Sequence, residues 1–446
     1  TVTYDAMDIT AGSSNTIVDS YIQGSSAVVL SGSTGTVIGN SILVATNTTG
    51  ASLVLTGGNV NVSVSSSILS AFKGTPGAAA LYLDPNNRGW LVFSTNTLTG
   101  GQYGAYIATQ TAGTQVWLSS NTILVHSTGT IATYGLYVNG LMFGATIQNN
   151  RIYYRRSGPV SALGTTAFYA KTTDGIVFER NRINNPGMIT TGGFIGVDLY
   201  GADNMIFRYN DVHSTAPAIT TAIMLRLNAG SAGLQLKNNI FFSSFTAPVT
   251  SGTIIVTDAA SQTGFVADYN TYGSSNSLLG FKWTGGAQGL LAWQAASGQD
   301  DNTLSVNPQW FNVDAGVEDF HPRSTSGRYN PVTQAFVATD LIQSLSVDAG
   351  DGADLVLLEP TPNGGRVNQG SYGATAEASK SATYPGCVVS NSVHKINGPY
   401  TTIQTAVNAL PTTLTGHSCV VIRDGATYNE QVTVEGFTNN GSSITI

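Results

Sequence analysis

Short runs of alternating apolar and polar residues recur along much of the chain. The clearest examples begin at Gly104, where GAYIAT…QVWLSSNTI is followed by GLYVNG…ATIQNNRI and AFYAKT…GIVFERNRI. Each unit contains an alternating strand, a turn, a second alternating strand, an asparagine and a third short apolar stretch. One unit has too little apolar surface to form a core alone, so we expect the units to stack on one another.

The recurring asparagine sets the period. The anchors are Asn96, Asn121, Asn150, Asn181, Asn210, Asn239 and Asn270, and the steps between them are 25, 29, 31, 29, 29 and 31 residues. A period of this length with period-2 strands inside it predicts a solenoid. Weaker anchors at Asn15, Asn40 and Ser66 extend the pattern, so we expect about nine or ten turns in a column roughly 45 Å long. Asparagine suits a left-handed turn, and stacked amides can also bond along the axis.

Alignment of the first strands predicts an apolar interior. The inward pairs are Val28/Leu30, Leu53/Leu55, Leu81/Leu83, Ala105/Ile107, Leu136/Val138, Phe168/Ala170, Val197/Leu199, Ile223/Leu225 and Ile254/Val256. The residues between them, expected to point outward, are Val29, Val54, Tyr82, Tyr106, Tyr137, Tyr169, Asp198, Met224 and Ile255. This outer column is too apolar for a solvated face, so either another segment covers it or it is a contact surface. Its four tyrosines could also stack against sugar rings.

The second strands carry a column of charges of both signs. Stacking at the same period places Glu179 beside Arg208, Lys237 beside Asp268, and Arg182 beside Asp211. Opposite charges on neighbouring strands stabilise a sheet by a few tenths of a kcal/mol each. We therefore expect a structural ladder of ion pairs along this face.

The repeats and their N-x-I/L/V anchors resemble the right-handed parallel β-helix proteins over about residues 1–280. The resemblance implies an all-β, right-handed parallel β-helix. It implies little about activity, because this fold hosts lyases, esterases, tailspikes and adhesins.

Residues 281–380 break the pattern and are rich in aromatic residues. The runs LLAWQAASGQDD and DFHPRSTS, with SVDAGD further on, resemble the closing segment of bacterial secreted β-helix repeat proteins. The aromatic residues are Trp283, Trp293, Trp310, Phe311 and Phe320. We expect this segment either to plug the last turn or to lie along the side of the coil, where part of it could cover the tyrosine column.

Residues 381–446 change character again. Tyr400, Ile403, Val407 and Leu410 have helical spacing, and Pro411 ends that helix. The following CVVIRDGATYNEQVTVEGF and SSITI contain three strand-like runs. Together these stretches resemble the opening of pectinesterase-type β-helices, in which a short helix caps the N-terminal end and the first strands follow. Here that opening element lies near the other end of the sequence.

The inverted order predicts head-to-tail assembly. A cap helix buries its apolar stripe against the first turn of a coil, so this segment would complete the coil of another copy, or of a later unit in a longer chain. The alternative is that the cap folds back on its own chain. The residues expected to make the contact are Tyr400, Ile403, Val407, Leu410, Val420, Ile422, Val432 and Val434. The sequence begins in strand-like TVTYDAMDIT without an initiator Met or signal peptide, so we expect a mature or excised piece of something longer.

Composition excludes some function classes. Charged residues make up 10% of the chain and the formal net charge is −7, which argues against a nucleic-acid partner. Apolar residues never run for about 18 positions, so no transmembrane helix is expected. Cys387 and Cys419 fit one disulfide of an exported protein, or alternatively two buried thiols.

Few residues have the types and spacing expected of a catalytic or metal-binding site. Asp198, Asp203 and Arg208 resemble faintly the paired carboxylates and arginine of pectinesterases, but we interpret them as a turn residue and members of the ion ladder. The aspartates of DAGDGAD, at Asp348, Asp351 and Asp354, lack the alternate spacing of a calcium loop. The five histidines show no metal-ligand spacing. We therefore expect no catalysis, no cofactor and no metal.

Two functions follow. The favoured one is an exported bacterial structural protein of the extracellular space or cell surface. It would be adhesin-like, would form a unit of a fibre or giant surface protein, and would have copies of itself as partners. The alternative is a carbohydrate-binding or carbohydrate-active β-helix, pectinesterase-like or lyase-like, with polysaccharide as its partner.

Overall fold

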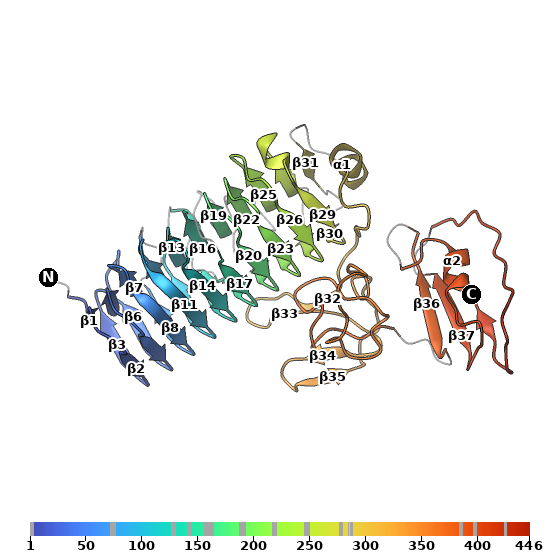
Figure 1. The fold of residues 1–446 in the computed structure, drawn as a ribbon, viewed down its shortest axis with the longest axis horizontal. Helices are drawn as coiled ribbons and strands as arrows, with labels where there is room; N and C mark the ends of the chain where they lie inside the picture. Colours follow the sequence, from blue (N-terminus) through green and yellow to red (C-terminus); the bar gives the residue numbers. More distant parts are fainter. Residues whose placement is uncertain are drawn as a thin grey trace.

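The structure is a computed structural model, in which the chain winds into a parallel β-solenoid (Figure 1). It describes residues 4–71, 77–125, 131–140, 144–155, 165–186, 193–215, 221–244, 250–275, 280–283, 285, 289–382, 387–395, 399–422 and 426–446. The coil makes about twelve turns, so the prediction of nine or ten was too low. The earliest turns are short, since Met7 aligns with Val28 only 21 residues later, and they lack the asparagine that marks the later ones.

Three parallel sheets form the walls of the coil. Sheet A has eleven strands: β1 (Met7–Thr10), β4 (Val28–Ser31), β7 (Ala51–Thr56), β10 (Ala79–Leu83), β13 (Tyr103–Ala108), β16 (Thr133–Asn139), β19 (Thr165–Lys171), β22 (Gly193–Tyr200), β25 (Thr221–Asn228), β28 (Thr250–Val256) and β31 (Phe281–Trp283). Sheet B has ten: β2 (Thr16–Val18), β5 (Val37–Gly39), β8 (Val60–Ser65), β11 (Arg88–Ser94), β14 (Gln115–Ser119), β17 (Thr146–Gln148), β20 (Val177–Glu179), β23 (Ile206–Arg208), β26 (Gln235–Lys237) and β29 (Val266–Asp268). Sheet C has ten: β3 (Tyr21–Gly24), β6 (Ile42–Ala45), β9 (Ile68–Ser70), β12 (Thr97–Gly100), β15 (Thr122–Val125), β18 (Arg151–Tyr154), β21 (Arg182–Pro186), β24 (Asp211–Thr215), β27 (Ile240–Ser244) and β30 (Thr271–Ser274).

The inward pairs of sheet A were predicted correctly at every turn but one. Val197 and Leu199 align with Leu225 and Leu227, so the predicted pair Ile223/Leu225 was wrong by two residues. Arg226, and not Met224, therefore points outward, and Met224 is buried. The error arises at the position directly before each inward pair of sheet A, where the chain turns a corner. The residue there also faces inward, so the alternation of inward and outward side chains is interrupted.

That corner normally holds a small residue. At Gly135 a Cβ atom would lie 2.6 Å from the carbonyl oxygen of Ala167 on the next turn, closer than real Cβ atoms approach. Met224 occupies the equivalent position in its own turn. Because it is large and apolar, the alternation of residues 223–225 predicted the wrong inward pair there.

The asparagine anchors form a buried ladder at the corner between sheets B and C. From Asn96 to Asn270, each Nδ2 donates to the Oδ1 of the next anchor, over distances of 3.0 to 3.2 Å. The first turns continue the ladder through the hydroxyls of Ser41 and Ser67. The predicted early anchors Asn15 and Asn40 were therefore wrong, whereas the one expected near Ser66 is the adjacent Ser67. The left-handed residue is the one before each anchor, such as Asn149 with φ 55°, so the anchor itself is selected for its hydrogen bonds.

Aromatic side chains plug the C-terminal end of the coil. Helix α1 (Leu290–Ser297), which follows the one-turn helix η1 (Ala260–Gln262), places Trp293 against Phe265, Phe281 and Trp283, and Trp293 is fully buried. Its indole Nε1 donates to Asp300 over 2.9 Å. The last ladder residue, Asn270, also donates to Asp300, so the ladder ends on this carboxyl group.

Residues 304–382 form a covering segment along sheet C. It contains two antiparallel hairpins, β32 (Trp310–Asn312) with β33 (Asp319–Pro322), and β34 (Arg328–Asn330) with β35 (Ala335–Val337). Trp310 and Phe320 pack with Tyr153 and Phe242 of sheet C, whereas Phe311 is 39% exposed and lies under Arg323 and Arg328. The aromatic residues thus divide between the plug and the side of the coil, and the side they cover is not the tyrosine column, which lies on sheet A.

The C-terminal segment, residues 387–446, forms a separate small stack. Strands β36 (Val389–Val393), β37 (Ser418–Ile422) and β38 (Ile444–Thr445) are parallel in that order, with helix α2 (Ile403–Asn408) between the first two. Figure 1 shows this segment at the opposite end of the molecule from the N-terminus. It is therefore not seated on the first turn of its own chain.

Candidate functional site

The C-terminal segment has a core of its own. Ala406 and Val407 of α2, with Leu410 just after it, pack against Val393 and Val420. Of the predicted assembly residues, Val407, Leu410 and Val420 are buried in this core, and Tyr400, Ile403 and Val432 lie partly buried against it. Ile422 and Val434 remain 41% and 47% exposed. The cap therefore packs on a core within its own segment, and of the eight predicted assembly residues Ile422 and Val434 are the ones left exposed.

An extended stretch, residues 426–435, lies against the N-terminus of α2. Glu430 accepts hydrogen bonds from the backbone N–H groups of Ile403 and Gln404, over 2.8 and 3.0 Å. The amide side chain of Gln404 bonds to both the N–H and the C=O of Thr433, over 2.6 and 2.9 Å. The sequence predicted a strand here, but the stretch belongs to no described sheet, because no described strand lies beside it.

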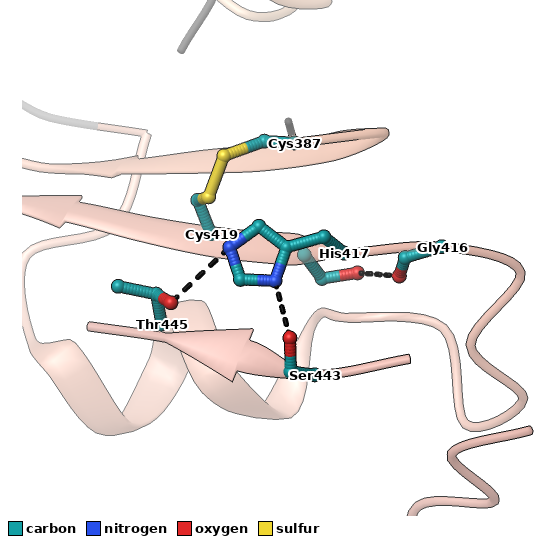
Figure 2. The surroundings of a disulfide bond; sticks show 7 residues. Cys387, Gly416, His417, Cys419, Ser443 and Thr445 are labelled. Atoms are coloured by element: carbon teal, nitrogen blue, oxygen red, sulfur yellow. Dashed lines mark hydrogen bonds between the residues drawn. A yellow bond between two sulfur atoms is a disulfide. The ribbon is translucent and has the colours of Figure 1, made fainter. Parts of the chain in front are cut away.

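A disulfide joins Cys387 to Cys419 at the edge of the same segment (Figure 2). His417 lies beside it and bonds to Ser443 and Thr445, over 2.5 and 3.2 Å, which ties β37 to the chain around β38. The ligand atoms of Cys387, His417 and Cys419 lie within 4.8 Å of one another, the one such group in the part of the chain that the structure describes. With the two sulfur atoms bonded to each other, no thiolate is available to a metal ion.

The N-terminal end of the coil is open in the described residues. Strands β1, β2 and β3 are each the first strand of their sheets. The interior is exposed there, because Ile9 and Ile22 are only partly buried, whereas Val28 of the next turn is fully buried. This end therefore presents three strand edges around an apolar centre.

Tyrosines form a double column on sheet A, which the described part of the covering segment leaves free. Tyr82, Tyr106, Tyr137 and Tyr169 stack with ring centroids 4.8 to 5.2 Å apart. Tyr103 and Tyr134 form a second, shorter column edge-on to the first. Because the rings of the first column face one another, mainly their edges and hydroxyl groups meet the solvent. Burial and neighbouring tyrosines raise the pKa of Tyr169 to about 12, so its hydroxyl is neutral at ordinary pH.

A groove of about 730 Å³ begins at Tyr134, Tyr137 and Tyr169 and ends at Asp198 and Arg226. Two hydrogen bonds, of 2.9 and 2.5 Å, link the Arg226 guanidinium to Asp198, and Asn228 also donates to Asp198. These hydrogen bonds, opposed by burial, raise the pKa of Arg226. The positive charge of Arg226 therefore balances the negative charge of Asp198 within the groove.

Asp198, Asp203 and Arg208, which the sequence analysis considered as a catalytic set, do not lie together in one site. Asp198 points outward from sheet A, whereas Arg208 lies on sheet B and pairs with Glu179 over 2.7 Å. Asp203 lies in the turn between them and accepts a hydrogen bond from the Ala232 N–H. The predicted pair Glu179–Arg208 is confirmed, and the resemblance to a pectinesterase site finds no geometric support.

The other predicted ion pairs are altered by the covering segment. Lys237 is the register neighbour of Asp268, as predicted, but its ammonium group pairs with Asp351 and Asp354, each over 2.8 Å. These contacts also engage two of the three aspartates weighed as calcium ligands. The third, Asp348, accepts a hydrogen bond from Ser381.

Arg182 and Asp211 are neighbours in register, as predicted, but Ser371 of the covering segment bonds to both, over 2.9 Å each. Sequence spacing could not reveal Ser371, because it lies 160 residues beyond Asp211.

Comparisons with protein-family models, with curated proteins and with solved structures found no match. Among the described residues, no helix has the length and apolar character needed to cross a bilayer.

Proposed function

We propose that this chain is a structural unit of an extracellular fibre, in which the C-terminal segment of one copy completes the open end of the coil of the next. The observation that carries the proposal is the placement of complementary ends. A capped start of a parallel stack lies at one end of the molecule, and at the other lies a coil whose first turn no described residue caps (Figure 1). Strand addition to an exposed edge is an established mode of association.

The geometry of such a contact favours a fibre over a closed ring. The two surfaces are different and lie at opposite ends of an elongated molecule, so each copy can bind one neighbour at each end. The likeness of the C-terminal segment to the opening of pectinesterase-type β-helices supports the assignment of α2 as a cap. The disulfide supports an exported, surface-associated protein.

Carbohydrate binding in the tyrosine groove is the weaker proposal. The groove has the size and the mixed aromatic and polar lining of a ligand site. However, stacking on sugars needs free ring faces, and Tyr106 and Tyr137 use theirs on each other. The separation of Asp198 from Arg208 gives no support to catalysis.

The test is assembly of the full chain. We expect wild-type protein to form filaments that grow with concentration, seen by negative-stain electron microscopy and sedimentation. Val434→Asp places a charge on the exposed apolar edge and should abolish assembly without changing the fold. Val332→Asp, at a position 89% exposed on the covering segment, is the matched control and should assemble normally. Wild-type protein that stays monomeric at all concentrations would refute the proposal.

A further inference from the structure

We propose that residues 426–435 are the docking strand, which pairs in parallel with β1 of the next copy, with Val432 opposite Met7 and Val434 opposite Ile9. This inference rests on the proposed function and specifies which strands meet and in which register. Three independent features of the chain support it: the order of strand positions, the direction of the backbone groups and the pattern of side chains.

The first feature is the order of strand positions along the chain. In the first turn, strands of sheets A, B and C begin at Met7, Thr16 and Tyr21, and the next sheet A strand begins at Val28. In the C-terminal segment, β37 begins at Ser418, the extended stretch follows, Thr438 makes an isolated parallel bridge, and β38 begins at Ile444.

The intervals match those of the coil. β37 and β38 align Ser418 with Ile444, 26 residues later, just as β6 and β9 of sheet C align Ile42 with Ile68. Thr16 precedes Tyr21 by 5 residues, and Thr438 precedes Ile444 by 6. β37 and β38 therefore occupy the place of sheet C, and residues 426–435 occupy the place of sheet A, of which β1 is the free edge.

The second feature is the direction of the backbone groups. In β1, Met7 donates its N–H to Ala27 of the following turn, so the N–H and C=O of Asp8 face the open edge, because backbone groups alternate along a strand. In the extended stretch, both backbone groups of Thr433 bond to Gln404 on the side of the cap. The groups of Val432 and Val434 therefore face away from the cap, and neither has a hydrogen-bond partner among the described residues.

These two edges are complementary. In the proposed register, the N–H of Asp8 donates to the C=O of Val432, and the C=O of Asp8 accepts from the N–H of Val434. The coil uses the same arrangement between its own turns, where an inward-facing residue bonds forward to the next turn.

The third feature is the pattern of side chains. Val432 already packs on the core of the C-terminal segment, and Val434 is 47% exposed on the same side of the strand. At the open end of the coil, Met7 is 36% exposed and Ile9 is partly buried. The proposed register continues the inner column that runs from Met7 to Val28 and Leu53, and it places α2 as the cap of the neighbouring coil.

The experiment is disulfide trapping in the full chain. Asp8 and Thr433 are exposed, and in this register they lie directly opposite each other on adjacent parallel strands, about 5 Å apart, within the range of a disulfide. We expect Asp8→Cys/Thr433→Cys to give a ladder of covalent oligomers on a non-reducing gel. Asp8→Cys/Gln431→Cys, shifted by two positions on the same face, should give about tenfold less. Each single variant should give no ladder.

The outcomes separate the two proposals. If filaments form but the shifted pair links as well as the matched pair, or neither pair links, the register is wrong and head-to-tail assembly stands. If wild-type chains do not associate at all, both proposals fail. Circular dichroism of each variant checks that the coil is intact, which we expect because both substituted side chains are exposed.

Discussion

From Asn96 to Asn270, the corner between sheets B and C holds one buried asparagine in each turn, which bonds along the coil in both directions. The Oδ1 of Asn150 accepts from both the backbone N–H and the Nδ2 of Asn121, and its own Nδ2 donates to Asn181 and to the carbonyl of Leu118. No shorter side chain supplies both a donor and an acceptor at that reach. In the first turns the hydroxyls of Ser41 and Ser67 accept the N–H of the preceding turn but donate only to a carbonyl of their own turn, and the sequence signal is correspondingly weaker.

Loss of one ladder amide should therefore destabilise the coil measurably. Asn150→Ala leaves the buried N–H groups of Asn121 and the acceptor of Asn181 short of partners, and each unsatisfied buried group costs about 1–3 kcal/mol. We expect the free energy of unfolding to fall by about 3 kcal/mol, measured by urea denaturation.

The preceding residue gives the control. Asn149 has the left-handed conformation, with φ 55°, and glycine tolerates that conformation. Asn149→Gly should change stability by less than about 1 kcal/mol. Equal effects at the two positions would show that the turn, and not the ladder, determines the preference for asparagine.

At the scale of elements, the sequence predicts the features that recur in every turn of the coil, but it does not predict the contacts that the covering segment makes once. The strands of sheet A, their inward residues and the Glu179–Arg208 pair follow from periodicity, because each turn is packed like its neighbours. The covering segment breaks the other pairs, because Asp351, Asp354 and Ser371 reach the coil from far along the chain. The open and capped ends could be inferred only in outline, since the direction in which the backbone groups of Val432 and Val434 face is a property of geometry and not of composition.

Docking of the covering segment should depend on pH. Burial raises the pKa of Asp211 to about 7 and that of Glu359 to about 8. Both values exceed those of the unfolded chain, so the folded protein binds these protons more tightly. Their contribution to stability is full below about pH 4 and is lost as the pH rises through about 7 to 8. We expect the free energy of unfolding to fall by about 2 kcal/mol or more between about pH 5.5 and 8.5 in urea titrations.

A neutral side chain at this position should remove part of that dependence. Asp211→Asn cannot lose a proton, so its unfolding free energy should vary less over the same pH range than that of the wild type. Asp301→Asn, at an exposed position, should keep the wild-type slope. Parallel pH profiles for wild type and Asp211→Asn would contradict the assignment.

At the scale of the whole molecule, the N-terminal end of the coil and the C-terminal segment present different surfaces. One end offers strand edges around an apolar centre, and the other offers a capped stack whose residues 426–435 belong to no described sheet. A variant that damages only one of them can therefore join a filament but cannot extend it.

Asp8→Pro should act as such a terminator. Proline lacks the N–H that Asp8 presents at the open edge, and the bonds from β1 to β4 come from its neighbours, such as Met7. The variant can still bind through its C-terminal segment but cannot accept another copy. Added at about one part in ten, it should shorten filaments to about ten units, measured as length distributions by electron microscopy.

The control for this experiment is Asp8→Ala, which retains the N–H and should leave filament lengths unchanged. A length distribution that is insensitive to the proline variant would mean that β1 is not the growing edge.

The asparagine ladder also gives the coil an electrical direction. Every amide from Asn96 to Asn270 is oriented the same way, and the row ends on the oxygen of Asp300, which only accepts. Strand dipoles within sheets largely cancel, whereas these aligned side-chain amides add. Copies joined in one orientation would sum their moments, so a solution of long polymers should become birefringent in an applied field, and the signal should rise with polymer length.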